Sequence, residues 1–121
     1  ASGGFTKALG DQARGVVVTQ VFPSERSLNY PVIKEAMGLA KAKGIAELTP
    51  AMVEGFINAK VLVEGLRRAS PKPDRARMLA ALEGMRKFDL GGLELSYSAT
   101  DHSGLAFTDL SIVGSDGRFK R

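Results

Sequence analysis

Few side chains in this 121-residue chain could carry acid–base or metal chemistry. His102 is the only histidine, it stands next to Asp101, and the chain has no cysteine. An imidazole oriented by a carboxylate can act as a general base, but no nucleophile is spaced to suggest a partner. Because residues 100–104 have the composition of a turn, we interpret the pair as polar turn residues. A single histidine without cysteines also argues against a transition-metal site.

Two stretches that contain glycine were candidates for binding a phosphate or a cation. Gly91 and Gly92 lack the preceding strand and following helix that a dinucleotide-binding loop needs. The stretch from Gly114 to Gly117 lacks acidic residues at the spacing of a calcium loop. We interpret both as turns, and we predict no cofactor, no metal and no enzymatic activity.

The formal net charge of +4 raises the question of nucleic-acid binding. The lysines and arginines are spread along the chain and mixed with acidic residues. No aromatic residues alternate with them, as a stacking surface for bases requires. Charge alone speaks to solubility and weak association, so we predict no nucleic-acid partner.

Glu54 and Phe56 are the more informative side chains, because they lie in the first turns of a long predicted helix. A carboxylate near a helix N-terminus is stabilised by the helix dipole, so Glu54 needs no further role. Phe56 lies on an apolar stripe, where packing in the core is the simpler explanation. The residues alone do not decide between these structural roles and a place in the wall of a ligand site.

The helix that carries these two residues runs from Thr49 to Ser70 and is the element around which the chain is organised. Thr49 is a hydroxyl N-cap and Pro50 takes the first helical position. Arg67 and Arg68 lie in the last turn, where their positive charges interact favourably with the helix dipole. Helical spacing predicts one apolar stripe and a second apolar ridge, so we expect the helix to pack between other elements. The stripe is Met52, Phe56, Ala59, Val63 and Leu66, and the ridge is Val53, Ile57 and Val61.

The flanking segments predict an α/β chain. A β-branched run from Gly15 to Phe22, ended by Pro23, is typical of a buried strand in a parallel sheet. Hydrophobic periodicity predicts helices over residues 30–43 and 74–87, the second capped by Asp74. Residues 93–97 and 106–113 read as two strands of an antiparallel hairpin around the turn at 100–104. Residues 114–117 read as a final tight turn.

The chain gives little information on its compartment. The absence of cysteine allows the cytosol and the periplasm alike. No apolar run approaches the roughly 20 residues that span a bilayer. The first residues lack the basic and apolar regions of a signal peptide, and the missing initiator Met suggests a processed or cut chain.

The order of these motifs resembles one known family. The motifs are GVVVTQVFP, a helix YPVIKEAMGLAKAKG, the E-G-F segment at Glu54–Phe56, and FDLGG followed by a D-H-S-G turn. Together, from about Leu9 to Phe119, they resemble the C-terminal third of a type I periplasmic binding protein. The group that they resemble most is the branched-chain amino-acid (leucine/isoleucine/valine) receptors of ABC importers.

The resemblance implies a two-lobed α/β architecture. It implies that residues 1–23 belong to the second lobe and its crossover, residues 24–90 to the helical part of the first lobe, and residues 91–121 to the return crossover and the C-terminal hairpin. It implies hinge roles for Gln20, Val21 and Pro23. It also implies that Glu54 and Phe56 lie near the ligand, with Phe56 in an apolar wall and Glu54 as a polar contact or hinge support.

The implied function is non-enzymatic binding of an amino acid or related small carboxylate between two lobes, for delivery to the permease of an ABC importer in the periplasm. The alternative is a small-molecule-sensing regulatory module of the same fold, and an exported precursor would favour transport over it. The serine/threonine loop that grips the ligand carboxylate in relatives would lie upstream and is not in this chain. We therefore expect the chain to act with the remaining part of a receptor or to self-associate.

Overall fold

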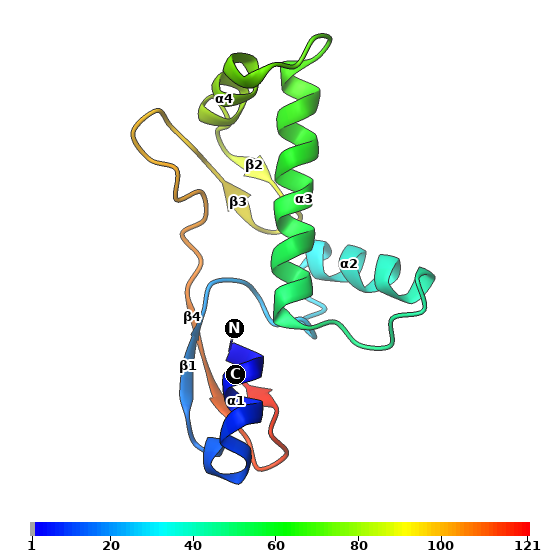
Figure 1. Ribbon diagram of the computed structural model, residues 1–121, viewed down its shortest axis with the longest axis vertical. Coiled ribbons are helices and arrows are strands. Elements are labelled where there is room, and N and C mark those ends of the chain that lie inside the picture. Colours follow the sequence, from blue (N-terminus) through cyan, green and yellow to red (C-terminus); the bar gives the residue numbers. More distant parts are fainter. Residues whose placement is uncertain (1) are drawn as a thin grey trace.

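The computed structural model describes residues 2–121, which form two separately packed bodies (Figure 1). The helices are α1 (Ser2–Leu9), the 3₁₀ helix η1 (Gly10–Ala13), α2 (Pro31–Ala42), α3 (Pro50–Ala69) and α4 (Arg75–Glu83), and the strands are β1 (Val17–Gln20), β2 (Phe88–Asp89), β3 (Glu94–Leu95), β4 (Asp109–Val113) and β5 (Phe119–Lys120). We call α1, η1, β1, β4 and β5 the terminal body and α2, α3, α4, β2 and β3 the central body. Residues 21–30, the first crossover, and residues 96–108, the second crossover, join them.

The long helix α3 begins and ends where the sequence predicts. The Thr49 side chain accepts a hydrogen bond from the backbone N–H of Met52 at 3.2 Å, and Pro50 opens the helix. This satisfies one of the amide groups that a helix N-terminus leaves without an intrahelical partner. Arg67 and Arg68 lie in the last turn. The N-cap therefore fixes the start of α3, and its first turn lies close to the first crossover (Figure 1).

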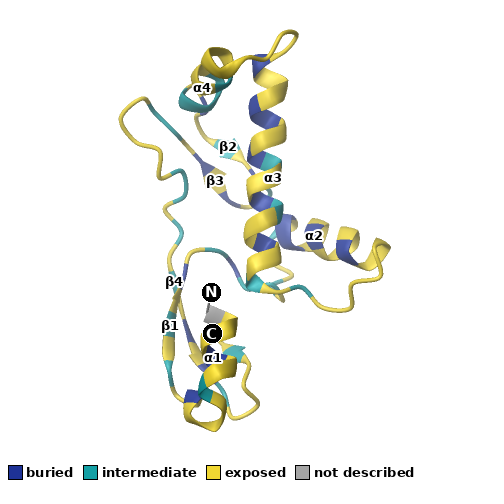
Figure 2. Cartoon of the chain, viewed as in Figure 1, coloured by how far each residue is buried: buried dark blue, intermediate teal, exposed yellow. Residues whose placement is uncertain are grey.

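The face of α3 that enters the core is the ridge of Val53, Ile57 and Val61. The prediction that the other stripe is also covered is wrong within the described residues, because Met52, Val63 and Leu66 are exposed. Buried and exposed bands follow each other along α3 in Figure 2. The ridge packs against α2 and the β2–β3 pair, and the core cluster consists of Val32, Ile33, Val53, Ile57, Val61, Met85, Leu90, Leu93 and Leu95.

Helix α2 packs largely as predicted, with Val32, Ile33, Ala36 and Ala40 buried. Met37, which was expected on the same face, is 39% exposed. Helix α4 starts at its predicted cap, where Asp74 Oδ1 accepts the N–H of Arg77 at 2.8 Å. It ends at Glu83 with Gly84 as the C-cap, so the prediction that it reaches residue 87 is wrong. A glycine has low helix propensity, which favours the earlier end.

The hairpin of the central body differs from the predicted one. β2 pairs antiparallel with β3, in the register Phe88↔Leu95 and Asp89↔Glu94, with Gly91 and Gly92 in the turn. Residues 106–113 do not return to β3, and the bridge that forms next to the predicted turn is an isolated one between Ser96 and Gly104. Instead, β4 pairs with β1 in the terminal body.

The strand β1 is antiparallel and half exposed, so the prediction of a buried strand in a parallel sheet is wrong. It pairs with β4 in the register Val17↔Ile112 and Thr19↔Leu110, within a sheet of order β1-β4-β5. Val17 is 60% exposed and Ile112 is 46% exposed. The predicted turn at residues 114–117 is confirmed, since it joins β4 to β5. In the described part of the chain, no helix has the length and hydropathy needed to cross a membrane.

Candidate functional site

Four of the five residues singled out from the sequence line one pocket where the first crossover meets α3. Gln20, Val21 and Pro23 contribute from the crossover side, and Glu54 contributes from the second turn of α3. This crossover pocket has a volume of about 260 Å³, and its other lining residues are Thr19, Phe22, Pro50, Ala51 and Arg121. The N-cap at Thr49 and the crossover that follows β1 together create it, because they place the first turn of α3 against residues 19–23.

The hinge candidates differ in burial. The Gln20 amide donates from Nε2 to Oγ of Ser111 at 2.8 Å, and both residues are buried. Pro23 is buried as well, whereas Val21 is 59% exposed. Because a buried polar group must keep its hydrogen-bond partner, the Gln20–Ser111 bond fixes the end of β1 against β4.

Glu54 is exposed in the second turn of α3. Within residues 2–121 its carboxylate makes no ion pair and no side-chain hydrogen bond with another residue. It is therefore available to a polar group that enters the crossover pocket.

Phe56 does not line the crossover pocket. Two residues along a helix turn by about 200°, so Phe56 points away from the side of α3 that carries Glu54. Its ring is half-buried against the central core, and Nζ of Lys60 lies 5.7 Å from the ring centroid. The described residues therefore do not bring Glu54 and Phe56 together in one site.

Arg121 is a residue of the crossover pocket that the sequence did not reveal. Its Nη1 donates to Oδ2 of Asp109 at 2.8 Å, and its Nη2 donates to the Phe22 carbonyl at 3.1 Å. The guanidinium, together with the backbone N–H of Leu110, lowers the pKa of Asp109 below its ordinary value. These partners are far away in sequence, so no local motif could have indicated the contact.

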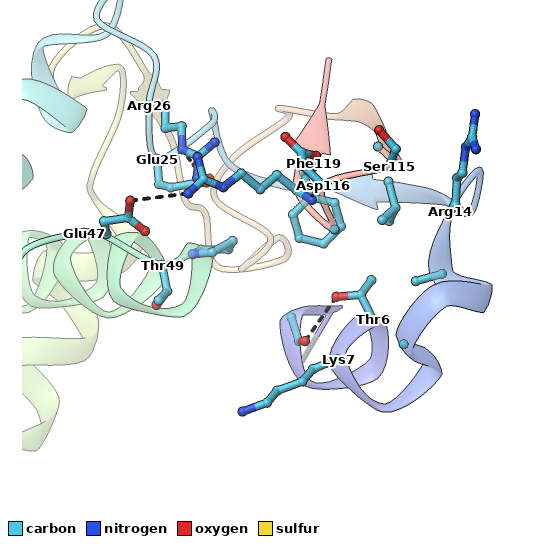
Figure 3. Close-up of a pocket in the computed structure, with 18 of the residues that line it drawn as sticks. Thr6, Lys7, Arg14, Glu25, Arg26, Glu47, Thr49, Ser115, Asp116 and Phe119 are labelled. Carbon is cyan, nitrogen blue, oxygen red and sulfur yellow. Dashed lines mark hydrogen bonds and ion pairs between the residues drawn. The ribbon is translucent and has the colours of Figure 1, made fainter.

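A larger cavity lies between the two bodies (Figure 3). Its volume is about 850 Å³. The terminal body contributes Thr6, Lys7 and residues 113–119, and the other wall comes from the first crossover, residues 47–49 and the start of α3. Nη2 of Arg118 lies 3.8 Å from Oε1 of Glu47, which links the two walls across the cavity. The remaining charged lining residues are Asp11, Arg14, Glu25, Arg26 and Asp116.

The sequence reasoning missed this inter-body cavity. Its walls come from segments at both ends and in the middle of the chain, and each of them has an ordinary composition. A mixture of lysine, arginine, aspartate and glutamate on its lining can bind a solute that carries both charges, because each charge of the solute finds an opposite one.

The Asp101–His102 pair is not a catalytic dyad in the structure. Oδ1 of Asp101 accepts the backbone N–H of Ser103 at 2.8 Å, and this hydrogen bond lowers the pKa of Asp101. Nε2 of His102 lies 3.2 Å from Oε1 of Glu83, at the end of α4. Among residues 2–121 there is no group of three or more His, Cys, Asp or Glu residues placed to hold a metal ion.

Comparisons with known proteins give a consistent result. A family model described as a periplasmic binding protein matches residues 3–117. The chain is 35% identical to a substrate-binding periplasmic protein from Ralstonia solanacearum, with a TM-score of 0.84 over 97% of this chain and 34% of that one. A comparison with curated proteins finds no match.

Two further solved structures are similar. An extracellular ligand-binding receptor from Verminephrobacter eiseniae ef01-2 is 27% identical, with a TM-score of 0.77 over 90% of this chain and 31% of that one. A possible leucine/isoleucine/valine-binding protein from Rhodopirellula baltica SH 1 is 29% identical, with a TM-score of 0.78 over 96% of this chain and 32% of that one. The chain thus spans about a third of the length of these relatives. The match over nearly the whole chain, with the same arrangement of strands and helices, shows that this chain belongs to the type I periplasmic binding protein family.

Proposed function

We propose that the chain supplies the matching third of a two-lobed protein that binds a small solute between its lobes. In this proposal the terminal body is part of one lobe and the central body is part of the other. The observation that carries it is the cavity of about 850 Å³ whose walls come from both bodies. Ligand sites occur preferentially at such domain boundaries, and volumes of about 300–1,000 Å³ are usual for them.

We infer that the solute is an amino acid or a related small carboxylate. Two features support this class. Lys7, Arg14 and Arg26 line the inter-body cavity together with Glu25 and Glu47, which suits a molecule with an ammonium and a carboxylate group. The similar structure from Rhodopirellula baltica is described as a possible leucine/isoleucine/valine-binding protein. The further roles that we propose are delivery to the permease of an ABC importer and location in the periplasm.

The mechanism that we propose is closure by a population shift. A solute that contacts both lobes at once stabilises the closed arrangement, because only there does it make both sets of contacts. Gln20, Val21 and Pro23 would lie in the hinge. Glu54 would act as a polar contact or hinge support, and Phe56 would belong to an apolar wall once the rest of the receptor is present. No bond is made or broken in this mechanism, in line with the generally non-enzymatic solute-binding family.

Calorimetric titration tests this proposal. The protein titrated contains this chain and is as long as its solved relatives. We expect one amino acid or small carboxylate in a panel to bind at a single site. Glu54 lines the crossover pocket, which shares Pro50 with the inter-body cavity, so we propose that the solute also reaches Glu54 and that Glu54→Gln weakens the binding. Glu94→Gln, which removes an exposed carboxylate from β3, should not weaken it. Failure of the whole panel to bind to the folded protein would overturn the proposed ligand class. Equal affinities of the wild type and the Glu54→Gln variant would remove Glu54 from the site.

A further inference from the structure

The two crossovers leave the sheet of the terminal body at one common point. β1 ends at Gln20, and its register partner there is Asp109, the first residue of β4. The first crossover starts directly after Gln20, and the second crossover ends directly before Asp109. No other segment of the described chain joins the two bodies, so we infer that any rotation of one body against the other turns about this point.

At this point Arg121 binds to the first crossover and to the first residue of β4, where the second crossover ends. One guanidinium nitrogen donates to the carboxylate of Asp109 at 2.8 Å, and the other donates to the carbonyl of Phe22 at 3.1 Å. The side chain of Arg121 is only 20% exposed. A planar guanidinium can bridge two acceptors in a fixed geometry, whereas the single ammonium of a lysine is a point charge on a flexible stem.

Phe22 extends this contact to the central body. Its side chain packs against the core cluster of the central body, while its backbone carbonyl accepts the hydrogen bond from Arg121. The hydrogen bond therefore joins the last segment of the terminal body to a residue that is anchored in the central body. Asp109 is negatively charged at neutral pH, as an aspartate with an ordinary pKa is, and the hydrogen bond from Arg121 lowers that pKa further.

We propose that Arg121 is a positioning residue that holds the first crossover against the start of β4, where the second crossover ends, and thereby restricts the rotation of one body against the other. This inference rests on the proposed function in one respect, namely that this rotation is the motion that closes the protein around its solute. A residue in this place does not need to touch the solute. It acts by changing the fraction of molecules in the binding-competent arrangement, and the apparent affinity changes with that fraction.

Distance measurements between two spin labels test the proposal. The chain has no cysteine, so Ala8→Cys on α1 and Lys34→Cys on α2 place one label on each body, both at exposed positions. Pulsed electron paramagnetic resonance should give a broader distribution of label-to-label distances for Arg121→Ala than for the parent, the doubly labelled chain that keeps Arg121. Arg121→Lys should give an intermediate width, since it retains a charge near Asp109 but cannot bridge both acceptors. Singly labelled chains identify any distances between molecules.

Lys120→Ala is the matched control, because Lys120 pairs with Asp116 at 2.9 Å inside the terminal body. It should leave the distribution unchanged. Circular dichroism and melting curves establish that each variant is folded, and Arg121→Lys provides the comparison if Arg121→Ala does not fold. A distribution for the folded Arg121 variants identical to that of the parent, or an equal broadening by Lys120→Ala, would overturn the proposal.

A separate titration distinguishes the proposed ligand class from the proposed role of Arg121. It uses a protein that contains this chain and is as long as its solved relatives, and it titrates leucine and other amino acids. Absence of binding there, combined with the broadened distribution, would refute the proposed ligand class and leave the role of Arg121 in place. Solute binding together with an unchanged distance distribution would refute the role of Arg121 and leave the proposed ligand class in place.

Discussion

The most strongly perturbed carboxylate of the described residues is Glu64, which is buried on α3. Nε of Arg67 donates to Oε2 at 2.9 Å, and Nε of Arg68 donates to Oε1 at 2.6 Å. These hydrogen bonds, from Arg67 first and then Arg68, lower its pKa to about 2 against the opposing effect of burial. Arg68 also lies over the ring of Phe88, at 5.7 Å from the ring centroid, so the cluster joins α3 to the β2–β3 pair.

The lowered pKa of Glu64 predicts a loss of stability in acid. The unfolded chain binds a proton at Glu64 near pH 4.3, whereas the folded protein does so near the value of about 2. The stabilisation is therefore fully present above about pH 5 and disappears as the pH falls to about 2, and it amounts to at most about 3 kcal/mol. Urea unfolding at a series of pH values should show a shallower decline for Glu64→Gln than for the wild type.

The control for this prediction is Glu94→Gln, which alters an exposed carboxylate. It should follow the wild-type pH dependence. If the wild type and Glu64→Gln decline in parallel, the hydrogen bonds from Arg67 and Arg68 do not stabilise the folded state in the way described.

Gly91 is the backbone position least able to accept a side chain. Its φ is +113°, and a Cβ there would lie 2.7 Å from the backbone N of Val32. The same backbone contact holds α2 to the hairpin, because the N–H of Val32 donates to the Gly91 carbonyl at 3.0 Å. We expect Gly91→Ala to lower the free energy of unfolding by about 2 kcal/mol or more, through backbone strain and loss of this contact.

Gly117 provides the comparison for this prediction. Its φ is +71° but a Cβ there would meet no atom within 4 Å, so Gly117→Ala carries the backbone strain alone. We expect it to cost about 1 kcal/mol. Chemical denaturation measures both values, and a Gly91→Ala variant no less stable than Gly117→Ala would contradict the close contact with Val32.

At the scale of single residues, the sequence predicts what depends on local chemistry. Thr49 and Asp74 cap their helices as expected, because capping joins atoms only three residues apart. The partner of His102 was not predictable from the sequence. Glu83 is 19 residues away along the chain, and only the fold brings its carboxylate next to the imidazole. Arg121 was not predictable for the same reason: its carbonyl partner, Phe22, lies at the other end of the chain.

At the scale of elements, α3 shows both the strength and the limit of hydrophobic periodicity. The pattern gave the extent of the helix and both of its apolar ridges. It could not tell which ridge α2 and the β2–β3 pair cover, because periodicity describes one element without its neighbours. The strands show the same limit. The alternation of residues 93–97 and 106–113 predicts two strands, and the structure has the shorter strands β3 and β4 inside these ranges. The pattern did not show that β3 pairs with β2 across the short Gly91–Gly92 turn.

The burial of α3 predicts unequal effects of two truncations on the same helix. Ile57 is 2% exposed in the core, and Val63 is 64% exposed on the other stripe. Ile57→Ala should lower the free energy of unfolding by about 2–5 kcal/mol, since it leaves a cavity. Val63→Ala should change it by less than about 0.5 kcal/mol. Denaturant titration of the 121-residue chain measures both, and a larger loss for Val63→Ala would contradict the assignment of the core face.

At the scale of the whole molecule, two groups of exposed apolar residues each share one face of an element or strand pair. The first is the outer face of the β1–β4 pair, with Val17, Val21, Leu110 and Ile112. The second is the exposed stripe of α3. Contiguous apolar surfaces of this kind are unusual on an isolated monomer and mark places of association. The chain spans about a third of its solved relatives, so we propose that other parts of a longer receptor cover these surfaces.

The chain on its own should therefore self-associate. We expect size-exclusion chromatography with light scattering to give a mass above 12.9 kDa that rises with concentration. The double variant Val17→Thr/Ile112→Thr removes apolar groups at one register pair and should shift the equilibrium toward the monomer. A folded chain that stays monomeric at every concentration tested would count against the proposal that these surfaces are normally covered.

The central claim is that a solute binds between two bodies that close around it. Small-angle X-ray scattering tests it most directly, on a protein of the relatives' length that carries this chain, without and with a saturating concentration of the amino acid that binds in calorimetry. We predict that the radius of gyration falls on binding, because closure brings the two lobes together. A saturated protein with an unchanged radius of gyration would contradict the closing mechanism and limit the solute to one body.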